Sequence, residues 1–509
     1  MLKLSDLALR SDLQLGPMLV SPSRRLVEGP GGRAHLEPLI MQVFLLLFDA
    51  GGKVVTRNEL FDQCWGGVIV GDDSLNRAIA KVRRTAGQVA PGLLEIETIP
   101  RTGYRLTGEV LDFLNGDAAE PPVAAAPQKV SRRTLVAGGA AAIAALGAGG
   151  FWYVRSREDR EFNDLMESGK EALATNDPDN HPSEYFRKAV ALRPDDAKAQ
   201  GNLAYAYALR TDDGQPDRTR ISLQEAEKAA SAALALDPNE PNAHLARVIT
   251  QSGSLDLLGT EERLRRILAM DPNNTNVMKQ LWNLLQCVGR SQEALAFVDR
   301  SLTINPLASG SYYPRAQLLW ITGHTAEADR VIARAMQYWP NHRFVRFARF
   351  IIFAFTDRPR AALAMLEKPE TAPQSYSPEA IALWKVSLPA LDERTPASIE
   401  TARRANLDAV KKDLRLTSQA TMVMSALGEI DTAFEIVNAF FAVGGPGNSR
   451  RGVKAPAKST AWRFAPWLFI PPIAPMRADP RFLQLCDGIG LTDYWKARNV
   501  KPDYLAQIA

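Results

Sequence analysis

The first hundred residues of the chain contain apolar positions spaced as on a helix. Leu75, Ile79 and Val82 stand at i, i+4 and i+7, so we predict a helix over residues 74–85 with that face buried. Ser74 comes directly before the first apolar position, and its side-chain oxygen can accept from free backbone N–H groups, which makes it the predicted N-cap. The opposite face of this helix is polar and is therefore available to a ligand.

Two more helices and two strands are predicted around this helix. Residues 36–48 predict a helix buried on one side, and residues 57–64 predict a second helix after a glycine-containing turn. Residues 96–98 and 104–106 alternate apolar and polar positions and contain β-branched or aromatic side chains, which is typical of short strands. The turn at residues 100–103 joins these strands into a small basic hairpin.

The polar face of the predicted 74–85 helix is basic. It carries Asn76, Arg77, Lys81 and Arg84 beside Ala80, and no Asp or Glu occurs between residues 74 and 94. Such a face can approach DNA phosphates without repulsion, and Asn and Arg side chains can also read base edges in the major groove. An ordinary solvated helix face is the alternative interpretation of the same charge run.

Three motifs in this order resemble the winged helix-turn-helix DNA-binding domain of the OmpR type. They are VVTRNELFDQCWGG from residue 54, DDSLNRAIAKVRR from residue 72 and IETIPRTGYRL from residue 96, within roughly the first 110 residues. The resemblance implies that the 74–85 helix enters the major groove of double-stranded DNA and that the 98–105 hairpin reaches the neighbouring minor groove. The residues that it implies for DNA contact are Asn76, Arg77, Lys81 and Arg84 on the helix, Arg101 and Thr102 on the hairpin, and Thr56 and Arg57 near the preceding helix. Ala80 stands where many relatives have a polar side chain, which leaves the identity of the base contacts open.

Length, composition and charge limit the class of protein and the ways in which it can bind nucleic acid. The chain has 509 residues, of which 46% are hydrophobic and 23% charged, and this is the composition of folded protein with several domains. A net charge of +4 is too small for general coating of nucleic acid, so DNA affinity has to come from local arrangement. The three cysteines, Cys64, Cys287 and Cys486, provide no disulfide framework and are expected as buried thiols.

A linker and an uncharged segment follow the N-terminal motifs. Residues 115–128 are rich in Ala and Pro and read as a linker, whereas residues 134–154 contain no charged side chain. These 21 residues are long enough to span a bilayer and are flanked by arginines, so they predict a transmembrane helix. Five of them are glycines, which disfavours a helix in water. Ser131-Arg132-Arg133 also resembles a twin-arginine export signal, and this alternative stays open.

Prolines recur at equal intervals in the second half of the chain. Pro194, Pro238, Pro272, Pro306 and Pro340 are separated by 44, 34, 34 and 34 residues, and residues 211–220 have the size of an insertion in the first interval. This is the tetratricopeptide period. Small residues recur as well, and we expect them where two helices approach closely: Gly289 with Ala294, Gly323 with Ala328 and Gly428 with Ala433. Tyr207, Leu285, Leu319, Val298 and Ile332 are expected to fill interior positions.

The predicted domains follow from these boundaries. They are a winged helix-turn-helix domain at 1–110, a linker at 111–133, a transmembrane helix at 134–154, tetratricopeptide-like repeats at 155–342, irregular helical hairpins at 343–443, and a loop with a C-terminal capping segment at 444–509. In the last segment, Phe482, Leu485 and Trp495 are expected to cover the final repeat. The predicted fold class is multidomain: an α+β winged helix-turn-helix, one transmembrane helix and an all-α tetratricopeptide-like solenoid.

The sequence contains no recognisable catalytic pattern. It lacks HExxH, a phosphate-binding loop of the Walker type and paired CxxC motifs, and its five histidines have no ligand-like spacing. We therefore expect neither an enzyme nor a bound cofactor or metal.

The order of these segments resembles the ToxR and CadC class of membrane-anchored one-component regulators. The resemblance implies a transcriptional regulator in the inner membrane with a cytoplasmic N-terminus and a periplasmic repeat domain. Its expected partners are double-stranded DNA, a second copy of the chain on DNA, RNA polymerase, the membrane, and a protein or ligand at the repeats. The alternatives are a soluble regulator whose repeats bind a cytoplasmic protein, and a repeat scaffold with a degenerate winged helix.

Overall fold

The structure is a computed structural model that describes residues 7, 10–15, 17–65, 72–99, 102–109, 158–159, 161–175, 180–212, 216–251, 257–306, 308–340, 342–368, 371–441 and 465–506. The chain divides into two compact units, residues 1–171 with 182–195 and residues 172–181 with 196–509. Among the described residues, all strands belong to the first unit and the second unit is helical.

The first unit begins with an antiparallel sheet that was not predicted from the sequence. Its strands pair in chain order and are β1 (Leu13–Leu15), β2 (Met18–Ser21), β3 (Leu26–Gly29) and β4 (Gly32–His35). Met18 and Val20 are fully buried, and Val20 lies opposite Val27 in the register. Each strand has only three or four residues and is bounded by Gly, Pro or Ser, which is the sequence signal that could have revealed the sheet.

The predicted winged helix-turn-helix follows this sheet. Its helices are α2 (Pro38–Asp49), α3 (Arg57–Trp65) and α4 (Asp72–Val89), and its strands β5 (Val55–Thr56), β6 (Glu95–Ile99) and β7 (Gly103–Thr107) form a second sheet in the order β5-β7-β6. A Cβ atom on Gly103 would lie 2.0 Å from the carbonyl oxygen of Val55, so β7 can approach β5 only with glycine at this position.

Helix α4 is longer than predicted. It begins at Asp72, so Ser74 lies in the first turn, and the expectation that Ser74 is the N-cap is wrong. Acidic residues are favoured near the positive end of the helix dipole, and Asp72 and Asp73 therefore extend the helix toward its N-terminus. Its C-terminal end lies at Val89, four residues beyond Thr85.

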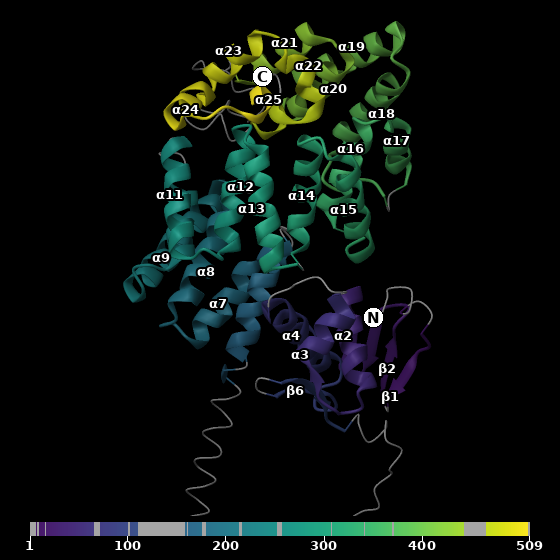
Figure 1. The fold of residues 1–509 in the computed structure, drawn as a ribbon, viewed down its shortest axis with the longest axis vertical. Helices are drawn as coiled ribbons and strands as arrows, with labels where there is room; N and C mark the ends of the chain where they lie inside the picture. Colours follow the sequence, from purple (N-terminus) through teal and green to yellow (C-terminus); the bar gives the residue numbers. More distant parts are fainter. Residues whose placement is uncertain are drawn as a thin grey trace, which may run out of the picture. The chain divides into compact units, whose positions relative to one another are not determined.

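Antiparallel helices make up the rest of the described chain. Helix α7 (Pro182–Leu192) belongs to the first unit, and the second continues with α8 (Ala197–Ala208), η2 (Leu209–Asp212), α9 (Pro216–Leu236), α10 (Pro241–Thr250), α11 (Leu257–Met270), α12 (Thr275–Cys287), α13 (Ser291–Ile304), α14 (Ser309–Ile321) and α15 (Thr325–Tyr338). Figure 1 shows α12 to α15 as neighbouring helical hairpins. The helical repeat is confirmed, since each predicted proline follows the end of a helix by two residues. The expected insertion at 211–220 is partly helical, because α9 begins within it.

The helical hairpins continue through α16 (Arg343–Ala354), α17 (Pro359–Glu367), α18 (Pro378–Glu393), α19 (Pro396–Lys412), η3 (Leu414–Leu416), α20 (Thr417–Leu427) and α21 (Ile430–Phe441). Among the side chains expected inside the repeats, Leu285, Leu319, Val298 and Ile332 are buried. Tyr207 is half-buried, and Tyr205 on the same helix takes the fully buried position.

The recurring glycines act differently from the prediction. Gly289, Gly323 and Gly428 follow α12, α14 and α20 with φ values of +75°, +88° and +83°. The next N–H group returns to the helix in each case, as where His324 donates to the carbonyl of Leu319 at 2.7 Å. This is the Schellman closure of a helix, which requires a left-handed residue. Close helix approach is instead a property of Ala294, Ala328 and Ala433, which are fully buried.

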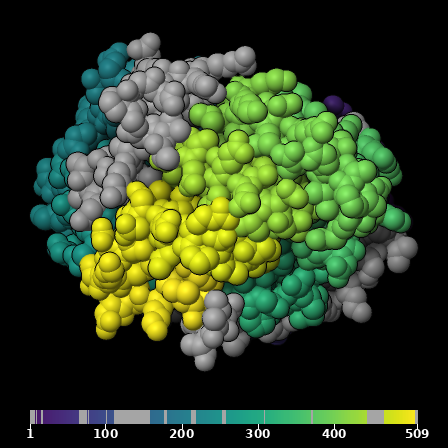
Figure 2. Space-filling model, turned by 90° about the horizontal axis from the view of Figure 1, so that it is seen from above, coloured from purple at the N-terminus to yellow at the C-terminus, as the bar shows by residue number. Residues whose placement is uncertain are grey.

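The C-terminal segment folds back on the repeats. It consists of η5 (Pro466–Phe469), η6 (Pro471–Ile473), α22 (Ala474–Arg477), α23 (Arg481–Gly488), α24 (Leu491–Arg498) and α25 (Asp503–Ala506). In Figure 2 this yellow segment lies against the yellow-green helices, and η6 and α22 pack on α20. Phe482, Leu485 and Trp495 are buried as predicted. The segment also reaches the middle of the repeats, because η5 packs on α12 and α24 packs on α11.

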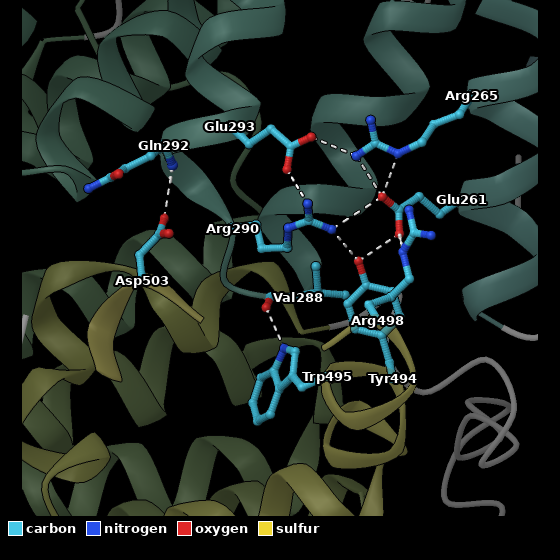
Figure 3. A network of polar contacts seen from close by, with 10 residues as sticks. All are labelled: Glu261, Arg265, Val288, Arg290, Gln292, Glu293, Tyr494, Trp495, Arg498 and Asp503. Atoms are coloured by element: carbon cyan, nitrogen blue, oxygen red, sulfur yellow. Dashed lines mark hydrogen bonds and ion pairs between the residues drawn. The ribbon is translucent and has the colours of Figure 1, made fainter. Parts of the chain in front are cut away.

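A buried carboxylate joins α24 to α11 and α13 (Figure 3). The side chain of Glu261 is 0% exposed, and its two oxygens accept from Arg265 Nε at 2.7 Å and from the Tyr494 hydroxyl at 2.8 Å. Arg498 Nε lies 2.9 Å from the carboxylate and Arg290 Nη1 3.2 Å from it. Burial alone raises the pKa of Glu261, but the bonds from Arg498, Tyr494 and Arg265 outweigh it and lower the pKa.

Two further hydrogen bonds complete this attachment. Trp495 Nε1 donates to the carbonyl of Val288 at 2.9 Å, and the backbone N–H of Gln292 donates to Asp503 at 2.8 Å. Residues about 200 positions apart in the sequence are therefore held together by polar side chains as well as by apolar packing.

The predicted transmembrane helix requires a correction. In the part of the chain that the structure describes, no helix is both long and apolar enough to cross a membrane. Residues 134–154, on which the prediction was based, lie outside the described residues. They are mainly Ala and Gly, which drive membrane insertion far less than Leu, Ile and Phe. The fold class is corrected to a winged helix-turn-helix with α-helical repeats, and the predicted inner-membrane localisation is wrong on the same finding.

Candidate nucleic-acid interface

Helix α4 separates an apolar face from a polar face. Leu75, Ile79 and Val82 are at most 1% exposed, which confirms the predicted buried face. On the other side, Asn76 and Arg84 are exposed and Ala80 is half-buried. Asn76 and Arg84 are therefore the exposed polar side chains among the described positions of this face, and the environment of each one decides what it can contact.

Three side chains from different elements meet beside α4. Arg57 at the start of α3 donates through Nη1 to the Tyr104 hydroxyl of β7 at 2.9 Å, and that hydroxyl donates to Oδ1 of Asn76 at 2.7 Å. Arg57 also donates through Nη2 to the same Oδ1 at 3.3 Å, and its guanidinium lies 5.6 Å from the centroid of the Tyr104 ring. We call this the Arg57–Tyr104–Asn76 triangle. It ties α3, α4 and the wing together.

A second contact joins α4 to the wing. Arg83 donates through Nε to the carbonyl of Ile96 at 3.0 Å and through Nη2 to the Thr98 hydroxyl at 2.6 Å. Tyr104 and Arg83 were not among the site residues predicted from the sequence. Their available signal was weak: Tyr104 stands on a strand of the predicted hairpin, and Arg83 lies at the border of the polar face of α4.

Lys81 is less free than the sequence suggests. It is half-buried, and its Nζ lies 2.7 Å from Glu37 and 2.6 Å from Glu171, both within the first unit. Burial lowers the pKa of Lys81, but the two carboxylates outweigh this effect and raise it, so the ammonium group stays charged. Residues 74–94 contain no Asp or Glu, but other elements bring the carboxylates of Glu37 and Glu171 to this face.

The other predicted site residues are placed as follows. Arg84 donates to the Ser168 hydroxyl and lies 3.9 Å from Glu171. Arg77 belongs to α4, while Arg101 lies outside the described residues. Thr102 is exposed, and its carbonyl accepts from the backbone N–H of Arg57 at 3.1 Å.

Thr56 has a structural role at the start of α3. Its backbone N–H and its hydroxyl both donate to the Glu59 carboxylate at 2.8 Å, and its hydroxyl accepts from the backbone N–H of Glu59 at 3.2 Å. This reciprocal arrangement is a capping box, and the bonds from Thr56 lower the pKa of Glu59. It fixes the beginning of α3, from which Arg57 reaches the triangle.

Cysteine and metal chemistry can be assessed for the described residues. Cys64, Cys287 and Cys486 are buried and unbridged, and burial raises the pKa of Cys64 to about 12, so this thiol stays protonated. Within the described ranges, no group of three or more His, Cys, Asp or Glu side chains is arranged to hold a metal ion.

The N-terminal unit resembles domains of known regulators. Residues 31–106 match the protein family described as Transcriptional regulatory protein, C terminal. The chain is 25% identical over 118 residues to the transcriptional activator CadC of Escherichia coli, covering 23% of each protein. It is 34% identical over 79 residues to the transcriptional regulator HilA of Salmonella typhi, covering 16% of this chain and 14% of HilA.

A third regulator and a protein outside this class extend the comparison. The chain is 28% identical over 96 residues to the phosphate regulon regulatory protein PhoB of Pseudomonas aeruginosa, covering 19% of this chain and 41% of PhoB. It is 26% identical over 271 residues to the cellulose synthase operon protein C of Xanthomonas axonopodis, covering 48% of this chain and 18% of that protein. The chain thus spans less than half the length of each of these relatives.

Solved structures resemble the helical part at low overall similarity. They include YrrB, a TPR protein with an unusual peptide-binding site, at 20% identity and a TM-score of 0.27, covering 38% of this chain and 95% of YrrB. They also include yeast Tom70 at 16% identity and a TM-score of 0.32, covering 64% of this chain and 67% of Tom70. The family match and the related regulators make residues 31–106 a transcriptional-regulator DNA-binding domain of the OmpR type, and helical repeats with the tetratricopeptide period follow it in the same chain.

Proposed function

We propose that this chain is a transcriptional regulator that binds double-stranded DNA sequence-specifically through α4 and the β6–β7 hairpin. The observation that carries the proposal is the attachment of the wing to α4 by the Arg57–Tyr104–Asn76 triangle and by Arg83. Because these contacts hold the helix and the hairpin as one surface, both can engage neighbouring grooves of one duplex without further ordering.

The roles of the individual residues follow from their surroundings. Arg84 is exposed and, although it donates to Ser168, its guanidinium group has further donors that suit a phosphate contact. Asn76 suits a base edge. Arg77, Arg101 and Thr102 remain proposed DNA contacts on the resemblance. Lys81 contributes charge near the groove, but its bonds to two carboxylates make it a weaker contact than the sequence implies.

Two copies of the chain on one operator are part of the proposal. A single winged domain buries limited surface, whereas pairing makes the second contact intramolecular and raises the affinity by orders of magnitude. RNA polymerase is the expected partner of a regulator bound in this way.

The repeats are proposed to bind a segment of a partner protein. Amide side chains form a row across three adjacent helices: Asn242 donates to Asn202 at 3.3 Å, and Asn276 donates to Asn242 at 3.2 Å. On the next turn of α12, Gln280 donates to the Tyr205 hydroxyl at 3.3 Å. Asn202 and Asn242 are buried, whereas Asn276 and Gln280 of α12 are half-buried. Amide groups can donate to and accept from the backbone of an extended peptide, so these two residues of α12 are the proposed contacts for the partner.

The test is salt-dependent binding of the full chain to duplex DNA. A sequence selected from a random duplex library is measured by fluorescence anisotropy at several salt concentrations with wild type, Arg84→Ala and Arg33→Ala. Arg33→Ala removes the same charge from the exposed strand β4 and is the matched control. We expect Arg84→Ala to weaken binding and to reduce the salt slope by about one unit, with little change for Arg33→Ala. No duplex binding by the wild type, or equal losses in both variants, contradicts the proposal.

A further inference from the structure

We propose that Asn76 reads DNA as a hydrogen-bond donor only and selects guanine over adenine at one operator position, with Arg57 and Tyr104 as its positioning residues. The inference rests on the proposed DNA binding through α4 and adds the specificity of one side chain. It follows from the Arg57–Tyr104–Asn76 triangle, which occupies the amide oxygen of Asn76.

The chemistry of the partners fixes which amide atom faces them. A guanidinium group has five N–H donors and no acceptor, so the Asn76 atom that lies 3.3 Å from Arg57 Nη2 has to be the oxygen. The Tyr104 hydroxyl accepts from Arg57 Nη1 and therefore points its single proton at the same oxygen. Turning the amide over would place its NH₂ group against the guanidinium group of Arg57, which cannot accept a hydrogen bond.

The consequence is an amide with its two ends in different surroundings. Both lone pairs of Oδ1 are engaged inside the domain, on the side where Tyr104 is only 3% exposed. Asn76 as a residue is exposed, and in the described part of the chain its Nδ2 donates to no protein acceptor. Two amide hydrogens thus remain for a ligand, while the oxygen does not.

This asymmetry decides among the bases. An asparagine that reads adenine in the major groove donates to N7 and accepts from the N6 amino group, which requires a free amide oxygen. Guanine presents two acceptors, O6 and N7, and thymine presents one, O4, whereas cytosine presents a donor. A donor-only side chain is therefore satisfied best by guanine and next by thymine, and it leaves the amino group of adenine or cytosine unpaired.

The experiment is selection of operators from a random duplex library by the full chain, followed by affinity measurements on single-base variants. Wild type is compared with Asn76→Ala, Tyr104→Phe and Arg84→Ala. We expect one position per bound domain at which wild type prefers guanine by about tenfold and Asn76→Ala has no preference. Tyr104→Phe removes one donor from Oδ1 and is expected to admit adenine at that position only. Arg84→Ala is expected to weaken all sequences alike.

The outcomes separate this inference from the proposed function. If the wild type selects no sequence, the proposed sequence-specific DNA binding is contradicted. If it selects an operator but Asn76→Ala changes no position, or if the position that depends on Asn76 prefers adenine or cytosine, the inference is overturned while DNA binding stands. Guanine at the Asn76-dependent position supports it, whereas thymine there overturns the selection of guanine. Circular dichroism of Asn76→Ala and Tyr104→Phe verifies that both variants are folded.

Discussion

Replacing Glu261 by glutamine tests whether charge holds the C-terminal segment on the repeats. Glutamine keeps the size of the side chain but removes the negative charge that Arg265, Arg290 and Arg498 share. It also turns one of the two acceptor oxygens into a donor, which then faces guanidinium groups or the Tyr494 hydroxyl. We expect α24 to detach from α11 much more often in this variant.

The magnitude follows from the burial of the network. Removing one partner of a buried ion pair costs about 3–5 kcal/mol because the remaining charges stay unpaired. The Glu261 side chain is 0% exposed, but those of Arg265, Arg290 and Arg498 are 33%, 15% and 26% exposed, so water can reach these cations in part. Arg265 and Arg290 also keep an ion pair with Glu293, so only part of the positive charge loses its partner. We therefore expect the lower end of that range, about 3 kcal/mol, which corresponds to about a hundredfold more frequent local opening.

Hydrogen–deuterium exchange measures this opening directly. Backbone amides of residues 491–498 should exchange about a hundredfold faster in Glu261→Gln, while those of α15, which lies away from the network, should not change. Glu262→Gln alters the neighbouring exposed side chain and serves as the control. Exchange in α24 within a factor of three of that control would refute the reasoning, because the attachment would then depend on apolar packing.

Three further predictions concern glycines and one buried acid. Gly289→Ala should destabilise the repeats clearly more than Gly323→Ala in thermal unfolding. Both glycines have positive φ, but only a Cβ atom at position 289 would meet Phe469 at 2.7 Å and Pro502 at 2.9 Å. Equal losses of stability would argue against docking of the C-terminal segment at this turn. Burial raises the pKa of Glu240 to about 7, so the contribution of this side chain to stability is full below about pH 4.5 and is lost as the pH rises through 7. The decline is worth at most about 3 kcal/mol, and Glu240→Gln should remove it from melting temperatures measured between pH 5 and 8. An unchanged pH profile in this variant would contradict the prediction. Gly87 lies at an exposed position inside α4, where a Cβ atom would meet nothing within 4 Å. Gly87→Ala should therefore stabilise the DNA-binding domain by about 1 kcal/mol in thermal unfolding. A loss of stability would contradict the helix geometry.

Prediction succeeded where neighbours in the sequence determine the structure. The buried face of α4 follows from the spacing of Leu75, Ile79 and Val82, and the helical repeat follows from the spacing of the prolines. The glycines after α12, α14 and α20 were located correctly but assigned the wrong role. A glycine at a helix end looks the same in a sequence whether it permits close packing or a left-handed turn, and only the backbone conformation distinguishes the two.

The N-terminal sheet and the uncharged segment show the limits of composition. Strands of three or four residues are too short for an alternation pattern to stand out, so β1 to β4 were missed. Residues 134–154 met the criteria of length and lack of charge, but these criteria do not distinguish Ala and Gly from the more apolar Leu, Ile and Phe. The described helices include none that could span a membrane.

By itself, the sequence determined the basic helix, the hairpin and the period of the repeats, because each depends on residues within about 40 positions of one another. Only the tertiary structure decided which polar side chains of α4 are free. It brought Glu37 and Glu171 to Lys81, and it engaged the oxygen of Asn76 with Arg57 and Tyr104. It likewise joined Glu261 to Tyr494 and Arg498 across more than 230 residues. Hydrogen bonds and ion pairs act over a few ångströms in space, and separation along the chain carries no record of which distant side chains will meet.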